Sequence, residues 1–249
     1  MGFEDHFSQL AEAYAAHRPS YPQALFEYLA SLAPGRELAW DCGTGNGQAA
    51  VALAQQFEQV VATDASAEQI EHAFVHERVR YAVEAAENTS IAAGCVDLTT
   101  VGTAVHWFDF EAFYAEVRRV SKPGAVLAVW TYHLSLIEPA VDACLERYYR
   151  QTLAGYWPER IRYLEERYRT LPFPFTEIET PPFEARATWN LAALLGFLSS
   201  WSAARNYAEQ QGRHPLHEII DELQGEWGDA EQERLVRWPL HLRVGRIAA

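Results

Sequence analysis

The stretch LAWDCGTGNGQAA, residues 38–50, places three glycines on alternate positions directly after a short apolar run. A glycine-rich turn between a strand and a helix lets the main chain approach a bound cofactor closely. Loops of this kind that hold a dinucleotide, a nucleoside triphosphate or a sulfonium compound differ in sequence. The residues around the glycines therefore indicate which of the three ligands is bound.

The spacing of the glycines argues against a ligand that carries phosphates. A dinucleotide fingerprint counted from Gly43 requires a third glycine where this chain has Gln48. A P-loop requires a lysine, and no lysine or arginine occurs between Leu38 and Ala65. Asp41 opens the loop instead, and its carboxylate repels a pyrophosphate and attracts an ammonium group. The expected ligand is a nucleoside that carries a positive charge.

A second carboxylate, Asp64, ends the next predicted strand. A carboxylate at that position accepts hydrogen bonds from the hydroxyls of a ribose. A ribose with a cationic amino-acid arm in place of phosphates is S-adenosylmethionine, which we therefore expect as the cofactor. The alternatives are that Asp41 only caps the helix after the loop and that Asp64 is an ordinary turn residue.

The chain around the loop alternates strands with helices. Strands are predicted at 37–41, 59–63, 79–83, 96–104, 125–132 and 234–247, with a further extended stretch at 175–188. The strands before residue 133 are mostly apolar on both faces, which is typical of a parallel sheet covered by helices. We predict an α/β fold with a doubly wound, mostly parallel, seven-stranded Rossmann-like sheet whose last strand is antiparallel.

We expect a single domain over residues 1–249. Its predicted parts are an N-terminal helical cap (1–33), a cofactor-binding core (37–133 and 234–248) and a helical insertion on the substrate side (134–233).

Composition narrows the partners and the compartment. The chain has 34 acidic and 20 basic residues, a formal charge of −14, which disfavours nucleic acid and anionic lipid as partners. No apolar run approaches the ~20 residues that span a bilayer. The N-terminus has no apolar signal core, and the three cysteines are widely spaced. We therefore expect a cytoplasmic protein, not bound to a membrane, that is a monomer or a homodimer.

These motifs resemble those of the class I S-adenosylmethionine-dependent methyltransferases. DCGTGNG is similar to the first motif of that family, and the Asp64 of VVATDAS to its second acidic position. YAVEAAENTS (81–90) and VDLTTVGTAVHWFD (96–109) resemble its adenine-binding stretch and its fourth strand. YAAHRPSYP, HWFD and the KPG turn resemble the trans-aconitate methyltransferase-like branch. The resemblance covers residues 3 to about 133.

The resemblance implies a set of cofactor-binding residues. They are Tyr14, Arg18, Asp41, Cys42, Gly43, Gly45, Asp64, Ala65, Ile70, Ala86, Glu87, Val101, Gly102 and Thr103. In this reading Tyr14 and Arg18 close over the cofactor. One departure concerns Ala85, because relatives often carry a polar residue there that binds the adenine amino group. Glu84, Glu87 or main-chain groups are the alternatives for that contact.

The expected reaction is methyl transfer to a small molecule by in-line displacement. A carboxylate acceptor needs no general base, whereas a hydroxyl, an amine or a carbon acid is helped by one. His106, which follows the fourth strand, is the first candidate base, and its alternative role is loop packing. Candidate acceptor-binding residues are His106, Trp107, Tyr132, His133, Trp201 and Tyr207.

Two other function classes stay open, a non-catalytic cofactor-binding protein and a methyltransferase that acts on a protein. No metal is expected, since His72 and His76 have ligand spacing but no evident third ligand.

Overall fold

The computed structural model of the protein describes residues 19–248, which fall into two compact units. The sheet unit contains Tyr21–Tyr132, Arg162–Glu184 and residues 240–248. The helical unit contains residues 19–20, His133–Ile161 and Ala185–Pro239. Tyr14, Arg18 and most of the predicted N-terminal cap lie outside the described residues. The division of the chain into a cap, a core and an insertion stays a prediction.

The sheet confirms the predicted fold class. Its strands, in the described part of the chain, are β1 (Leu38–Cys42), β2 (Gln59–Asp64), β3 (Val79–Val83), β4 (Val96–Gly102), β5 (Ser121–Thr131), β6 (Thr176–Glu177), β7 (Phe183–Trp189) and β8 (Arg234–Arg246). Their order is β3-β2-β1-β4-β5-β8-β6, and β7 also pairs with β8. Strands β1 to β5 are parallel to one another, and the last strand, β8, is antiparallel to β5.

The strand count differs from the prediction, with eight strands among residues 19–248 where seven were expected. The extended stretch predicted at 175–188 forms two strands, β6 and β7. Pro181 and Pro182 lie between them, and a proline has no N–H to donate to a sheet ladder.

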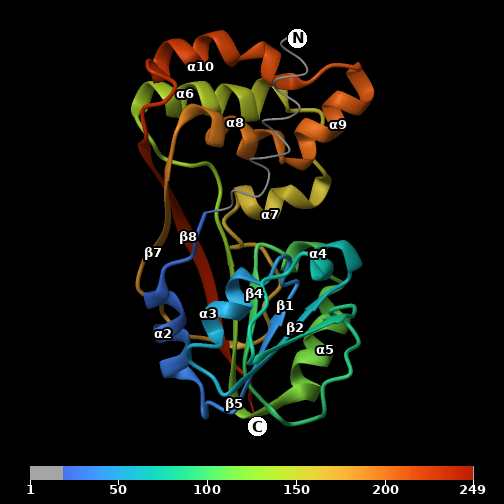
Figure 1. The fold of residues 1–249 in the computed structure, drawn as a ribbon. Helices are drawn as coiled ribbons and strands as arrows, with labels where there is room; N and C mark the ends of the chain where they lie inside the picture. The colour runs from blue at the N-terminus through green and yellow to red at the C-terminus, as the bar shows by residue number, and fades with distance from the viewer. Residues whose placement is uncertain (1–18, 249) are drawn as a thin grey trace. The chain divides into compact units, whose positions relative to one another are not determined.

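Helices cover both faces of the sheet (Figure 1). Those of the sheet unit are α2 (Gln23–Leu32), α3 (Gln48–Leu53), α4 (Ala67–Glu71), α5 (Phe110–Val120) and α7 (Arg162–Glu165). Phe26 of α2 packs against Trp130 of β5, with ring centroids 6.2 Å apart. Phe113 of α5 packs against Trp40 of β1 at 6.1 Å. The strand register places Trp40 and Trp130 on opposite faces, so α2 and α5 lie on opposite sides of the sheet.

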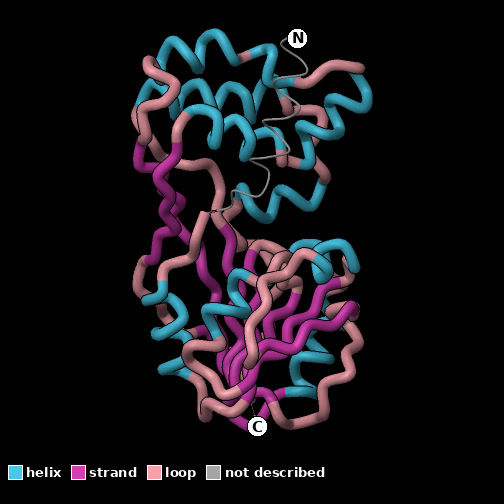
Figure 2. Tube along the Cα trace, in the orientation of Figure 1, coloured by secondary structure: helices cyan, strands magenta, loops and turns pink. Residues whose placement is uncertain are grey.

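The helical unit is mainly helix, as the cyan segments of Figure 2 show. Its elements include α6 (Pro139–Arg147), the π-helix η2 (Tyr148–Thr152), α8 (Leu191–Ser199), α9 (Ser202–Gln211), the short helices η3 (Glu159–Ile161) and η4 (Pro215–Glu218), and α10 (Ile220–Trp227). Among the described residues, no helix is both long enough and apolar enough to cross a bilayer.

The parallel strands that carry the predicted site end beside one another. Asp41 at the end of β1 pairs with Ala62 of β2 on one side and with Thr100 of β4 on the other. Asp41 and Asp64 therefore lie at the carboxyl edge of the sheet, where open α/β sheets bind ligands.

Candidate cofactor and active site

The glycine loop joins β1 to α3 with a backbone that favours glycine. Gly43, Gly45 and Gly47 have φ values of 66°, 57° and 83°, in the left-handed region. A Cβ on Gly43 would lie 2.6 Å from the Cβ of Ala104, and one on Gly47 would lie 2.2 Å from the Tyr81 hydroxyl. The backbone conformation favours glycine at all three positions. At Gly43 and Gly47, neighbouring side chains also leave no room for a Cβ.

Asp41 is buried at the end of β1. Its Oδ2 accepts a hydrogen bond from Thr44 Oγ1 at 2.6 Å, and its Oδ1 accepts one from Thr100 Oγ1 at 2.8 Å. Burial raises the pKa of Asp41 to about 6, against the lowering effect of these hydrogen bonds. A carboxylate has about four acceptor positions, so these two hydrogen bonds leave room for an ammonium group.

Asp64, at the end of β2, fixes the glycine loop. Its Oδ2 accepts from the Gly45 N–H at 2.9 Å, and its Oδ1 accepts from the Ser66 N–H at 2.9 Å. Each oxygen keeps a second acceptor position, which matches the two hydroxyls of a ribose. An ordinary turn residue would make the contact with the Ser66 N–H. The contact with the Gly45 N–H is different, because it connects this carboxylate to the glycine loop that begins at Asp41.

The end of β4 carries a strained residue. Thr103 has a φ of 55°, which is rare for a β-branched residue, and its N–H donates to the Trp130 carbonyl at 2.8 Å. A Cβ on the preceding Gly102 would lie 3.0 Å from the Trp130 ring. The Thr103 hydroxyl and the Trp130 indole N–H are buried and have no hydrogen-bond partner among residues 19–248. Strain and unsatisfied polar groups of this kind are found at functional sites.

The predicted adenine side of the site follows β3. Ala86 is buried, Ile70 of α4 is half-buried and Ala65 is exposed. Glu87 Oε1 accepts from the Asp109 N–H at 2.9 Å, and Glu84 Oε2 accepts from the Ser90 N–H at 3.0 Å. Both acids considered for the adenine amino group thus order the main chain around the loop.

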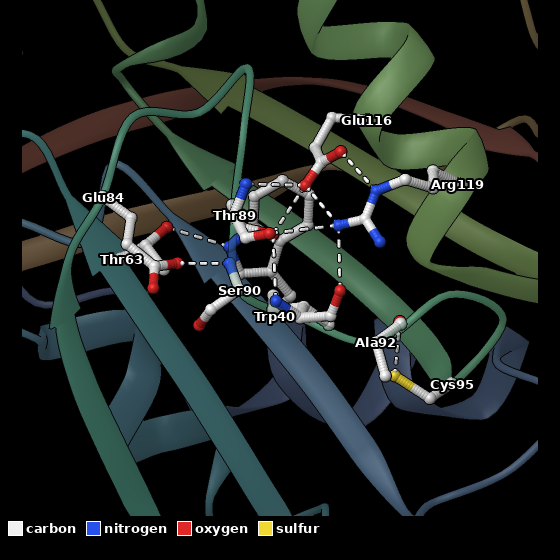
Figure 3. Close-up of polar contacts among 10 residues, drawn as sticks. Trp40, Thr63, Glu84, Thr89, Ser90, Ala92, Cys95, Glu116 and Arg119 are labelled. Carbon is white, nitrogen blue, oxygen red and sulfur yellow. Dashed lines mark hydrogen bonds and ion pairs between the residues drawn. The ribbon is translucent and has the colours of Figure 1, made fainter.

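An ion pair between the buried Glu116 and the exposed Arg119 anchors this adenine-side loop to α5. Glu116 accepts from the N–H and the hydroxyl of Thr89, both at 2.7 Å, and from the guanidinium of Arg119 (Figure 3). Arg119 also donates to the carbonyls of Thr89 and Ile91. Hydrogen bonding with Arg119 lowers the pKa of Glu116 to about 2 despite burial.

Replacing Glu116 with glutamine is expected to lower the free energy of unfolding by about 2 kcal/mol at pH 7. The folded-state pKa lies below the ordinary value of 4.5. The contribution is therefore complete above pH 4.5 and declines as the pH falls toward 2. Denaturant unfolding at several pH values measures this gap in unfolding free energy between the wild type and Glu116→Gln. Glu111→Gln on the exposed side of α5 is the control. A gap that stays constant down to pH 3 would contradict the assignment.

His106 lies in the short helix η1 (Val105–Trp107), directly after β4. Its imidazole is buried, with 2% of the residue exposed, and Nδ1 lies 2.8 Å from the Tyr168 hydroxyl. The next residue, Trp107, is half exposed. A buried imidazole at the ligand-binding edge of the sheet suits a general base, and the same burial suits the alternative of loop packing.

The other predicted acceptor residues divide between the two units. Tyr132 belongs to the sheet unit, while His133, Trp201 and Tyr207 belong to the helical unit. His133 packs against Tyr149 with ring centroids 4.8 Å apart. Trp201 contacts a cluster of aromatic rings from Tyr148, Tyr149, Trp157 and Phe197. Their roles toward an acceptor stay predictions.

Several contributors to the site were not predicted from the sequence. Thr44 and Thr100 hold Asp41, Tyr81 closes over Gly47, and Tyr168 meets His106. Thr100 had a signal, since Thr99 and Thr100 are polar residues in a strand that is otherwise mostly apolar. Tyr168 had none, because it lies far from His106 in the sequence.

The comparisons with known proteins agree with this site. A family model described as "Methyltransferase domain" matches residues 40–129. A protein of Dictyostelium discoideum named "Putative methyltransferase" is 32% identical over 225 residues, which cover 89% of this chain and 86% of the relative. A "Probable S-adenosylmethionine-dependent methyltransferase" of Saccharomyces cerevisiae is 24% identical over 80% of each chain.

Among solved structures, "a Putative Type II Methyltransferase from Anaeromyxobacter dehalogenans" is 47% identical, with a TM-score of 0.87. The match covers 94% of this chain and 99% of that one. Fold, site and relatives together define the class: this chain belongs to the class I S-adenosylmethionine-dependent methyltransferases. It is an enzyme of that family, and its cofactor is S-adenosylmethionine.

The residues present fit this cofactor. Asp41 retains acceptor capacity for the ammonium group, and Asp64 retains two acceptor positions for the ribose hydroxyls. The glycines carry no side chains, so a ligand can approach the main chain of the loop closely. No lysine or arginine occurs in the loop to favour a phosphate. Residues 19–248 contain no group of three or more His, Cys, Asp and Glu side chains arranged to hold a metal ion.

Replacing Asp41 with asparagine is expected to separate stability from binding. Burial raises the pKa of Asp41 from the ordinary value of 3.8 to about 6, so the ionised carboxylate costs the fold up to about 3 kcal/mol at pH 8. Asp41→Asn removes that cost, and Thr44 and Thr100 can hydrogen bond with an amide. Stability should rise at pH 8, and the gain should shrink as the pH falls from 6 to 3.8.

The same substitution is expected to weaken S-adenosylmethionine binding by about 10–100-fold, because a hydrogen bond with a charged partner is lost. Thermal unfolding and titration calorimetry measure the two effects. A variant that is less stable at pH 8, or that binds the cofactor normally, would contradict the role of Asp41.

Proposed function

We propose that this enzyme transfers the methyl group of S-adenosylmethionine to a small molecule, and that His106 removes a proton from the acceptor. The observation that carries the proposal is the buried imidazole of His106, whose Nδ1 lies 2.8 Å from the Tyr168 hydroxyl and which directly follows β4. The formal charge of −14 disfavours nucleic acid as the acceptor. The cytoplasmic location and the choice between a monomer and a homodimer remain predictions.

In this mechanism the protein forms no covalent bond with the substrate. Its main task is to align the acceptor atom, the methyl group and the sulfur. S-adenosylmethionine supplies a methyl group on a positively charged sulfur, which is open to in-line attack. Asp41 would bind the ammonium group, Asp64 would bind the ribose, and Gly43 would allow the main chain to approach the methionine arm. Holding the reacting groups in line accounts for about 7–11 kcal/mol of a barrier in well-oriented reactions.

A general base at His106 favours an acceptor that must lose a proton. Such an acceptor is a hydroxyl, an amine or a carbon acid. Proton removal by His106 would generate the attacking lone pair as the methyl group is transferred. A carboxylate acceptor would need cationic side chains instead. Arg160 and Arg205 are exposed within the helical unit, Arg162 lies over the Tyr163 ring, and Arg18 is outside the described residues. The proposal therefore favours an acceptor that loses a proton to His106, and a carboxylate acceptor is the alternative.

The test uses S-adenosylmethionine labelled in the methyl group and fractions of a metabolite extract. After the reaction, ultrafiltration separates labelled small molecules from labelled protein. Mild alkali then releases methanol from a methyl ester but not from an ether, a methylamine or a carbon-bound methyl. We expect label in the small-molecule fraction that resists alkali. Label released by alkali would indicate a carboxylate acceptor, and label confined to protein or absent from both fractions would overturn the proposal.

A further inference from the structure

We propose that the indole N–H of Trp130 donates a hydrogen bond to the carboxylate of the methionine arm of S-adenosylmethionine. Trp130 is not among the cofactor-binding residues that the sequence predicts. The inference uses Asp41 as the site of the ammonium group, and it depends neither on the identity of the acceptor nor on His106.

The Trp130 side chain carries a buried donor without a partner. It has no exposed surface, and its Nε1 has no hydrogen-bond partner among residues 19–248. Two equally buried tryptophans do have partners, since Trp40 donates to Thr63 Oγ1 at 2.9 Å and Trp227 to the Gln232 carbonyl at 3.1 Å. An unpaired buried donor is costly, so a ligand that brings an oxygen to Nε1 recovers free energy on binding.

The strand register places Trp130 on the same face of the sheet as Asp41. Asp41 of β1 pairs with Thr100 of β4, and Gly102, two residues further along β4, pairs with Trp130 of β5. Paired residues, and residues two apart in one strand, lie on the same face. The hydrogen bond of 2.8 Å from Thr100 Oγ1 to Asp41 Oδ1 agrees with this register. Only β4 separates the strands of the two residues.

Gly102 lets the indole lie over β4. A Cβ on Gly102 would lie 3.0 Å from Cζ2, 3.1 Å from Cε2 and 3.2 Å from Nε1 of Trp130. These atoms form the edge of the indole that carries the N–H group. Because β4 lies between β5 and β1, the donor is displaced from its own strand toward the strand of Asp41.

The chemistry of the methionine arm selects its carboxylate as the partner. The ammonium and the carboxylate are bonded to the same carbon, so an ammonium bound at Asp41 keeps the carboxylate nearby. Asp41 repels that carboxylate, which therefore turns toward a donor on the same face of the sheet. A hydrogen bond to an ionised acceptor is stronger than one between neutral groups. The Trp130 N–H meets these requirements.

Two aromatic rings pack on the indole. Tyr21 and Phe26 lie edge-on to Trp130, with ring centroids 5.3 Å and 6.2 Å away. Phe26 is buried, whereas Tyr21 is half-buried. The Tyr21 main chain is held, since its N–H donates to Gln48 Oε1 at 3.3 Å. We therefore expect the Tyr21 ring to move aside when the carboxylate reaches the indole.

Titration calorimetry with two ligands that differ only in the carboxylate tests the proposal without an acceptor. S-adenosylhomocysteine has the carboxylate, and its decarboxylated analogue has a hydrogen in that place. Trp130→Phe keeps an apolar ring but removes the donor. It should weaken binding of S-adenosylhomocysteine by about 10-fold or more, because a hydrogen bond to a charged group is lost. Its affinity for the decarboxylated analogue should equal that of the wild type.

Trp227→Phe is the matched control. Trp227 is also fully buried, and its indole N–H has a partner within the helical unit. This variant should bind both ligands as the wild type does. Equal weakening of both ligands in Trp130→Phe would show a packing defect and overturn the proposal. Unchanged binding of S-adenosylhomocysteine in Trp130→Phe would also overturn it.

A crystal structure of the wild-type protein with S-adenosylhomocysteine decides the question even if Trp130→Phe fails to fold. We expect a carboxylate oxygen within hydrogen-bond distance of Trp130 Nε1. A carboxylate held by other groups, with Nε1 left unpaired, would overturn the proposal.

These results are separable from the proposed function. Label confined to protein in the methyl-transfer experiment would contradict the small-molecule acceptor and leave the role of Trp130 intact. Methyl transfer to a small molecule by an enzyme whose Trp130 does not contact the carboxylate would do the reverse.

Discussion

Replacing His106 with alanine will lower kcat by about 10²–10⁴-fold with the acceptor that the labelled-methyl experiment identifies. A positioned general base contributes a factor of that size, because the acceptor must lose its proton as the methyl group is transferred. The KM for S-adenosylmethionine should change little, since Asp41 and Asp64 lie on other strands and keep their contacts. Steady-state kinetics with each substrate varied in turn measures both constants.

The variant leaves a cavity where a buried imidazole stood, so a loss of activity alone does not prove a base. Added imidazole separates the two readings. A missing base should be partly replaced by free imidazole, with a rate that increases with the concentration of its neutral form. A packing defect gives no such dependence. A kcat within a few-fold of the wild type would show that His106 is not the base.

Replacing Asp64 with alanine will weaken S-adenosylmethionine binding by about 100-fold or more. Two hydrogen bonds from ribose hydroxyls to a charged acceptor contribute about 1.5–3 kcal/mol each when measured by removal of one partner. The same carboxylate holds the Gly45 and Ser66 N–H groups, so the variant also loosens the glycine loop. Titration calorimetry measures the affinity, and far-ultraviolet circular dichroism and thermal unfolding check the fold.

Asp142→Ala is the control for this substitution. Asp142 accepts a hydrogen bond from the Ile137 N–H at 2.7 Å in the helical unit, so its loss also frees a main-chain donor. It belongs to no part of the proposed cofactor site, and binding should be unchanged. Equal affinity in the wild type and in a folded Asp64→Ala would remove the ribose assignment.

Much of the sheet could be predicted because its strands before residue 133 are mostly apolar. The residues 79–83 form β3 as expected, and β2 differs from its prediction by one residue. Two helices begin with residue types that favour such positions, since Ser66 accepts from the Gln69 N–H and Asp109 accepts from the Ala112 N–H.

The helical unit was predicted less well. Within it, Ser200 and Trp201 separate α8 from α9. Neither residue is a glycine or a proline, so no local signal marks the break. Tertiary packing decides it, since Trp201 contacts the rings of Tyr149 and Trp157.

The charges of the cofactor site could be predicted, but the contacts of those charges could not. Asp41 and Asp64 were identified from their positions at strand ends, because parallel strands bring such ends together. That Thr100 donates to Asp41 depends on the register of β4 against β1, which the sequence does not reveal. That Tyr168 meets His106 depends on a left-handed turn at two residues that are not glycine.

The central claim is that two carboxylates and a glycine loop select a nucleoside with a cationic amino-acid arm over a nucleotide that carries phosphates. Titration calorimetry of the wild-type enzyme with four adenosine compounds tests this claim most directly. S-adenosylmethionine and S-adenosylhomocysteine, which both carry the ammonium group and the ribose, should bind, and NAD and ATP should give no measurable heat. The same titrations of Asp41→Asn and Asp64→Ala should show weaker binding of the first pair. Binding of NAD or ATP with an affinity equal to that of S-adenosylmethionine would contradict the account.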